Sequence, residues 1–146
     1  MQGGGKMRKA ESVANYIIAE SLHQMHPVSN LQLQKILYYV QVHFLKKTKR
    51  PFFSDDIEAW QFGPVVPKIY YKYAGFGPAP ITVVRRLDID LDTREREDLD
   101  SIIKEKMMLS PWDMVEDTHQ AGKPWAMYYK EGERNVIPLK AMELYG

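Results

Sequence analysis

The chain has 146 residues, 45% of them hydrophobic and 12% aromatic, and its formal net charge is +1. This length and aromatic content are typical of one folded domain, and the absence of cysteine excludes disulfides, thiolate zinc sites and thiol catalysis. No apolar run approaches the ~20 residues that cross a bilayer, and no secretory signal opens the sequence, so we expect a cytoplasmic protein without a membrane partner.

The chain begins with a glycine-containing lead and a first helix. Residues 1–8 are expected to be flexible, so that a single domain spans residues 9–146. Apolar residues recur at helical spacing from about Lys9 to Met25 and predict one helix. The His26-Pro27 step ends it, because the residue before a proline avoids the helical region.

Residues 30–47 carry the clearest helix signals of the sequence. Ser29 and Gln32 form a capping box, and Val28 with Leu33 occupies the two positions of a hydrophobic staple. Apolar residues lie on two opposite sides of this helix. Because such a helix must be covered on both sides, we expect it to be the buried centre of the domain.

The most distinctive segment runs from Glu58 to Tyr73. Ile57–Phe62 predicts one short strand, and a Gly-Pro step then forces a sharp turn into a third helix that stops at Gly75. Trp60 is a large apolar side chain beside this corner. We predict that it is mostly buried and packs on the central helix near Tyr38 or Val42.

The second half of the chain predicts short elements. They are a strand at Ile81–Val84, a capped helix from Asp92 to Lys106, a helix from Ser110-Pro111 to Gly122, an aromatic helix from Pro124 to Tyr129, a strand at Asn135–Ile137 and a final turn or helix from Pro138 to Tyr145. Together these elements predict a mainly α (α+β) fold, a compact helical domain around a central buried helix with a small two-stranded β element.

Two Glu-x-x-His pairs, Glu20/His23 and Glu116/His119, have the spacing of helix-borne metal ligands. The first pair points away from the apolar face of its helix, and the central helix offers no inward glutamate, so we predict neither a metal nor an organic cofactor. His119 lies where a helix end meets the start of an aromatic helix. It suits either a structural contact with a helix-end carbonyl or a direct binding or catalytic role. No nucleophile elbow and no phosphate loop occurs, and we predict that the protein is not an enzyme.

The first fifty residues hold eight Lys and Arg against two Asp and Glu, and Lys46–Arg50 is the densest basic cluster. Cations are favoured at the end of a helix by its dipole. The same cluster suits contact with nucleic acid, although a nucleic-acid binder usually shows a wider basic stripe. We therefore keep nucleic acid as an alternative partner and do not expect it.

Three motifs resemble those of one known family. Leu31–Tyr39 resembles the "L-x-L-Q-K-L-L-Y" helix of the Panacea domain, the SocA/GepA-like antitoxin family found in bacteria and phages. Glu58–Tyr70 resembles its "E-A-W-x-x-G-P-V-x-P-x-x-Y" segment, and Thr118-His119 with Pro124-Trp125 resembles the later "H…P-W" element. The match spans about Ala14 to Tyr145. It departs from the family where Pro138 stands in place of a hydroxyl cap.

The resemblance implies an antitoxin-type protein-binding module that neutralises a toxin encoded nearby, by direct binding or as an adaptor that hands the toxin to a cytosolic protease. A second hypothesis is a nucleic-acid-binding phage or regulatory protein, and a third is an enzyme built around His119. We expect the contact surface to include exposed parts of the Phe62–Val65 corner and the Thr118–Trp125 turn. The motif or protein-binding residues are Lys35, Tyr38, Trp60, Phe62, Gly63, Pro64, Val65, Tyr70, His119, Pro124 and Trp125.

Overall fold

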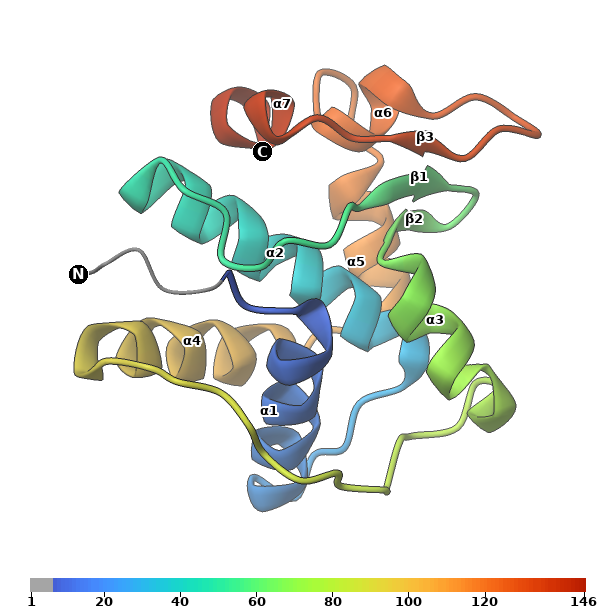
Figure 1. The fold of residues 1–146 in the computed structure, drawn as a ribbon. Coiled ribbons are helices and arrows are strands. Elements are labelled where there is room, and N and C mark those ends of the chain that lie inside the picture. Colours follow the sequence, from blue (N-terminus) through green and yellow to red (C-terminus); the bar gives the residue numbers. More distant parts are fainter. Residues whose placement is uncertain (1–6) are drawn as a thin grey trace.

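The computed structural model describes residues 7–146, so the first six residues of the expected flexible lead lie outside the described part of the chain. Helices dominate the described residues, and three short strands complete them (Figure 1). The elements in chain order are α1 (Ala10–His23), α2 (Asn30–Thr48), β1 (Glu58–Trp60), β2 (Gly63–Val65), α3 (Pro67–Tyr73), the 3-10 turn η1 (Ala74–Phe76), α4 (Thr93–Lys106), α5 (Pro111–Thr118), α6 (Pro124–Tyr128), β3 (Asn135–Val136) and α7 (Leu139–Tyr145).

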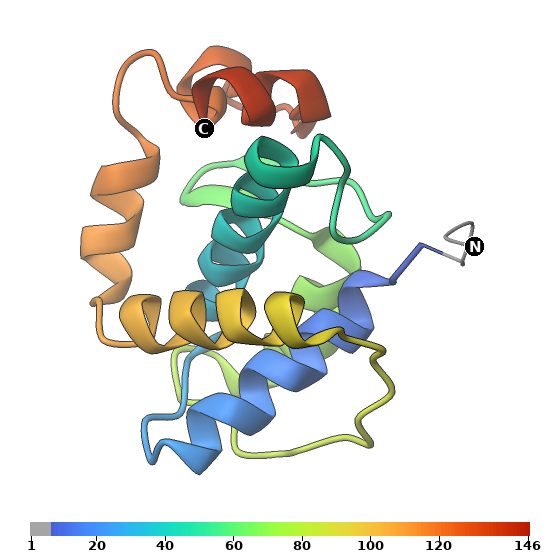
Figure 2. The ribbon, with the colours of Figure 1, turned by 90° about the vertical axis from the view of Figure 1, so that its left-hand side faces the viewer.

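Helix α2 is the centre of the molecule, as predicted. It contacts α1, α3, α4, α5, α7 and β2, and Figure 2 shows it enclosed by α4 and α1 below, α5 at one side and α7 above. Leu33, Ile36, Leu37 and Val40 are completely buried along it. The predicted mainly α fold is therefore confirmed, with a core arranged around this one helix.

The predicted capping box fixes where α2 begins. The Oγ atom of Ser29 accepts from the backbone N–H of Gln32 at 3.2 Å, and the Gln32 Oε1 atom accepts from the N–H of Ser29 at 2.9 Å. The Gln32 amide also donates to the carbonyl oxygen of Leu109 at 3.0 Å. The Gln32 side chain thus caps the start of the helix and also holds it to the segment before α5.

The β element is a three-stranded antiparallel sheet in the order β2-β1-β3, one strand more than predicted. Trp60 pairs with Gly63 across a two-residue turn, and Ala59 pairs with Asn135 on the other side. Pro64 lies in β2 at the sheet edge, where its missing N–H removes no ladder hydrogen bond. This hairpin and β3 bring residues far apart in the sequence to one side of α2.

The strand predicted at Ile81–Val84 does not form. Pro80 makes an isolated bridge with Ser29, and the N–H of Ile81 donates to the carbonyl of Val28 at 2.8 Å. Beyond that point the chain continues without regular structure as far as α4. By contrast, the predicted capping box of Asp92 and Glu95 is present at the start of α4.

Within residues 7–146, no helix combines the length and the apolar character that crossing a membrane requires. Arg8, the last residue of the expected lead, is held in place. Its guanidinium group pairs with Glu95 at 2.7 Å and lies over the ring of Phe52.

Candidate functional site

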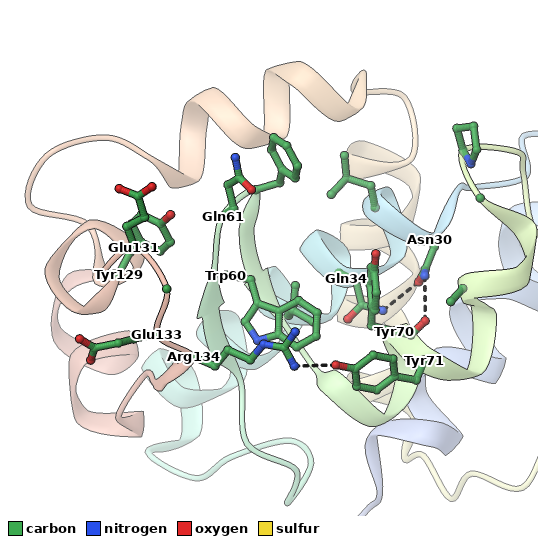
Figure 3. A pocket seen from close by; sticks show the side chains of 17 residues that line it. Asn30, Gln34, Trp60, Gln61, Tyr70, Tyr71, Tyr129, Glu131, Glu133 and Arg134 are labelled. Carbon is green, nitrogen blue, oxygen red and sulfur yellow. Dashed lines mark hydrogen bonds between the residues drawn. The ribbon is translucent and has the colours of Figure 1, made fainter.

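A partly open cavity of about 770 Å³ lies between the β1–β2 hairpin, α3 and the loop before β3 (Figure 3). We call it the aromatic groove, because three tyrosines, a tryptophan and a phenylalanine contribute to its walls. Its lining residues are Asn30, Leu31, Gln34, Trp60, Gln61, Phe62, Val65, Tyr70, Tyr71, Ala74, Gly77, Pro78, Tyr129, Glu131, Gly132, Glu133 and Arg134.

Trp60 stands in this groove and is half-buried, and the rings that it contacts belong to α3. The predicted packing near Tyr38 or Val42 of the central helix is therefore wrong. Successive side chains of a strand point to opposite faces, and in β1 it is Ala59 that is buried against the core. Trp60 therefore points outward and packs edge-on against Tyr70, with ring centroids 5.1 Å apart, and against Tyr71 at 5.8 Å.

Arg134 lies on the indole of Trp60. The guanidinium carbon is 4.3 Å from the ring centroid, and Nη1 donates to the hydroxyl oxygen of Tyr71 at 2.6 Å. Figure 3 shows this side chain reaching across Trp60 from the loop before β3 towards α3. A cation over an aromatic face is stabilised by the ring quadrupole, and the contact bridges the two walls of the groove.

The floor of the groove is fixed by two buried amides of α2. The Gln34 Oε1 atom accepts from the N–H of Val66 at 2.9 Å, and its Nε2 atom donates to Asn30 Oδ1 at 2.9 Å. Asn30 in turn donates to the carbonyl oxygen of Tyr70 at 3.0 Å. Because a buried amide without partners is costly, this chain of bonds holds the start of α3 rigidly against α2.

Lys35 lies on α2 beneath the hairpin and is completely buried. Its Nζ atom has no hydrogen-bond partner among the described residues, and burial lowers the pKa of Lys35 to about 7. The side chain passes directly over Gly63, where a Cβ atom would stand 2.3 Å from Lys35 Cε. Gly63 also has a φ of +125°, so both the space and the backbone require glycine there.

His119 caps the C-terminal end of α5, and its ring lies on Trp125, the first aromatic residue of α6. Burial and the nearby charge of Lys35 lower the pKa of His119, whereas the backbone of Phe62 acts in the opposite direction. Its Nε2 atom is buried without a partner among the described residues.

Trp125 connects the "H…P-W" element to the hairpin. Its Nε1 atom donates to the carbonyl oxygen of Trp60 at 2.6 Å, and Tyr129 stacks on the same indole with centroids 4.5 Å apart. Motif residues from three separate segments thus meet at the hairpin. The hairpin is supported from within by Lys35, His119 and Trp125, and Gly63 is the hairpin residue that lies against Lys35.

The other predicted site residues divide into two groups. Trp60, Phe62, Val65 and Tyr70 line the groove. Tyr38 is buried in the core, and Pro64 and Pro124 are buried where they shape β2 and the start of α6. Of the Phe62–Val65 corner, only Phe62 is exposed. Its ring packs edge-on against the exposed ring of Trp112, with centroids 6.3 Å apart.

Most lining residues of the groove were not predicted as site residues, and two of them, Arg134 and Tyr71, matter most for its chemistry. Arg134 stands among glutamates in an irregular loop, and no local pattern marks it. Tyr71 follows the motif residue Tyr70 on a short helix. The sequence did not indicate that its side chain is 56% exposed.

The basic cluster Lys46–Arg50 is partly neutralised by the fold. Lys47 Nζ and His43 Nε2 both contact Asp98 Oδ2, at 2.5 and 3.0 Å, and these contacts lower the pKa of Asp98. Lys49 Nζ lies 3.6 Å from Glu143. Among residues 7–146, no three His, Asp or Glu side chains gather in a way that could hold a metal ion.

The comparisons with known proteins point to one family. The family model "Antitoxin SocA-like, Panacea domain" matches residues 33–126, which include most of the central helix, the hairpin and Trp125. The chain is 31% identical over 127 residues to Antitoxin SocA of Caulobacter vibrioides (strain NA1000 / CB15N), covering 80% of this chain and 68% of that protein. No solved structure matches it. The chain belongs to the antitoxin SocA-like Panacea domain family.

Proposed function

We propose that this chain is an antitoxin that neutralises a protein toxin by binding it through the aromatic groove. The observation that carries the proposal is the groove itself, a set of partly exposed aromatic side chains to which the motif segments of an antitoxin family contribute Trp60, Phe62 and Tyr70. The toxin is the product of a neighbouring gene, and the encounter takes place in the cytoplasm.

The groove has the properties of a protein-binding hot spot. Binding energy at interfaces concentrates on a few rigid aromatic and arginine side chains. Trp60, Tyr71 and Arg134 contact one another, so little side-chain entropy remains to be lost on binding. The hydrogen-bonded floor of Asn30 and Gln34 holds the backbone at Val66 and Tyr70, on either side of the first turn of α3.

Binding accounts for the site better than catalysis does. Among the described residues, two buried titratable side chains have a nitrogen without a hydrogen-bond partner. These are Lys35 and His119, which lie beneath the hairpin, outside the residues that line the groove. The groove itself presents aromatic faces, one arginine and carboxylates. Lys35 and His119 therefore support the surface, and we assign no chemical step to them.

The proposal is tested by co-expressing the chain with the product of each neighbouring gene. We expect one product to arrest growth when expressed alone and the chain to restore growth. Co-purification of the two proteins would support direct neutralisation. Loss of the toxin that depends on a cytosolic protease would instead support the adaptor route. If no neighbouring product is toxic, or if none is neutralised, the antitoxin function is refuted.

The role of the groove is tested separately with exposed aromatic residues. Tyr71→Ala should abolish growth rescue, because it removes a groove wall and the hydroxyl that holds Arg134. Tyr145→Ala is the matched control, since this tyrosine is similarly exposed, at 50% against 56%, but lies on α7. Equal rescue by both variants would place the toxin elsewhere on the surface.

A further inference from the structure

We propose that the groove recognises an acidic side chain within an extended, apolar segment of the partner protein, and that Arg134 binds its carboxylate. This inference rests on the proposed function for the identity of the partner as a toxin. The recognition chemistry itself follows from the environment of Arg134.

The guanidinium group of Arg134 is held in one orientation. One face lies over Trp60, and Nη1 is used by the hydroxyl of Tyr71. The other N–H groups have no hydrogen-bond partner among residues 7–146. Arginine presents its donors as a planar fork that matches a carboxylate, and fixing the fork in advance lowers the entropy cost of binding.

The charge of Arg134 is not balanced by an ion pair within the described residues, although acidic residues are close along the chain. Glu131 and Glu133 line the same groove, and Figure 3 shows their carboxylates directed away from the guanidinium group. Glu58, on the neighbouring strand, accepts from Nε1 of Trp60 at 2.9 Å. An unpaired, oriented cation in an aromatic site therefore selects an incoming anion.

The rest of the groove selects a polypeptide segment as the carrier of that anion. The amides of its floor are engaged with each other and with the backbone, so the floor itself offers little to orient a small polar ligand. The walls are aromatic and aliphatic surfaces that extend from Arg134 to Gly77 and Pro78. Such walls suit apolar side chains on both sides of one acidic residue.

The inference is tested with a displayed library of short random peptides selected on the full chain. We expect the enriched peptides to share an Asp or Glu flanked by apolar or aromatic residues. In fluorescence polarisation, Arg134→Gln should weaken their binding by about tenfold or more, because a hydrogen bond to a charged group is lost. Replacing the peptide's acid by its amide should have the same effect. Arg134→Lys should restore only part of the affinity, because lysine lacks the planar fork.

Arg94→Gln is the matched control, since Arg94 is also exposed but lies on α4, and it should leave binding unchanged. Three results would overturn the inference. The first is that no peptide is enriched on the chain. The second is that the enriched peptides carry a Lys or Arg that takes the place of the Arg134 guanidinium group on Trp60. The third is that Arg134→Gln leaves the peptide affinity unchanged.

The peptide measurement requires no toxin, so the two proposals fail independently. Growth rescue without acidic peptide binding would refute this inference and leave the antitoxin function intact. Acidic peptide binding without rescue from any neighbouring toxin would refute the antitoxin function and leave this inference intact. Once a toxin is known, Arg134→Glu should lose rescue, and changing one toxin acid to lysine should restore it.

Discussion

The imidazole ring of His119 lies flat against the indole of Trp125, with ring centroids 3.5 Å apart and planes 5° from parallel. The same indole is hydrogen-bonded to the carbonyl of Trp60. The turn between α5 and α6 is thereby attached to β1, the strand that carries Trp60 into the groove. This attachment adds to the pairing of β1 with β3 and to the packing of β2 on α2, which also position the hairpin.

The first prediction concerns Trp125, which is only 8% exposed. Trp125→Ala should lower the free energy of unfolding by about 3–5 kcal/mol, since it empties a large buried volume. Trp125→Phe should cost less, because it retains a stacked ring and loses only the bond to the Trp60 carbonyl. Urea unfolding measures both. An alanine variant as stable as the parent would show that the stack does not support the fold.

The second prediction concerns the close approach of Gly63 and Lys35. Gly63→Ala should be strongly destabilising, because the new Cβ clashes with Lys35 Cε and the φ of +125° is unfavourable for alanine. The backbone strain alone is about 1–3 kcal/mol. In a double-mutant cycle with Lys35→Ala, the clash should disappear and the strain should remain. Additive effects of the two changes would contradict the contact.

The third prediction is a pH dependence of stability caused by Lys35. Its pKa falls from 10.5 in an unfolded chain to about 7 in the fold. Between these values the unfolded state binds more protons, so stability should rise as the pH increases from about 7 to about 9. The scale is roughly 1.4 kcal/mol per pKa unit. Thermal melts across this range should show Tm increasing.

Lys35→Met is the control for this effect, because it keeps an unbranched side chain, one atom shorter, without a titratable group. Its melts should be more stable near pH 7 and nearly independent of pH up to about 9. The pKa of His119 is also lowered. This histidine changes the stability only at pH values below its ordinary pKa of 6.5. Burial raises the pKa of Tyr16 to about 12. This shift makes stability fall with rising pH, but only above about pH 10. An unchanged slope in Lys35→Met would assign the dependence to other groups.

The fourth prediction concerns the start of α2. Ser29→Ala should cost about 1 kcal/mol, because an orphan N–H of the first turn loses its acceptor. Ser101→Ala, an exposed position on α4, should change stability by less than about 0.5 kcal/mol. Calorimetric melts of both proteins would test the capping box. Equal Tm values for the two variants would argue that water replaces the cap without loss.

The features that could be predicted from the sequence were local ones. The start of α2 and the start of α4 are both set by capping boxes, in which a side chain bonds to a backbone group three residues away. The central position of α2 followed from apolar residues on two sides of one helix. Such signals do not depend on which distant segment finally covers the helix.

The groove could be predicted only in part, because it depends on pairing between distant segments. The direction of Trp60 is decided by which face of β1 meets α2, and a single tryptophan does not encode that choice. Strand β2 was missed because its turn, Gln61-Phe62, has none of the glycine or asparagine residues that mark tight hairpins. Arg134 joins the groove only because β3 pairs with β1.

The three tryptophans occupy three different environments, which gives the molecule its own optical reporters. Trp112 is 67% exposed, Trp125 is 8% exposed, and Trp60 lies half-buried under a guanidinium group. A soluble quencher such as iodide should therefore reduce the emission of Trp112 first and that of Trp125 last. A variant that keeps only Trp60 would report occupation of the groove as a change in intrinsic fluorescence, without any attached dye.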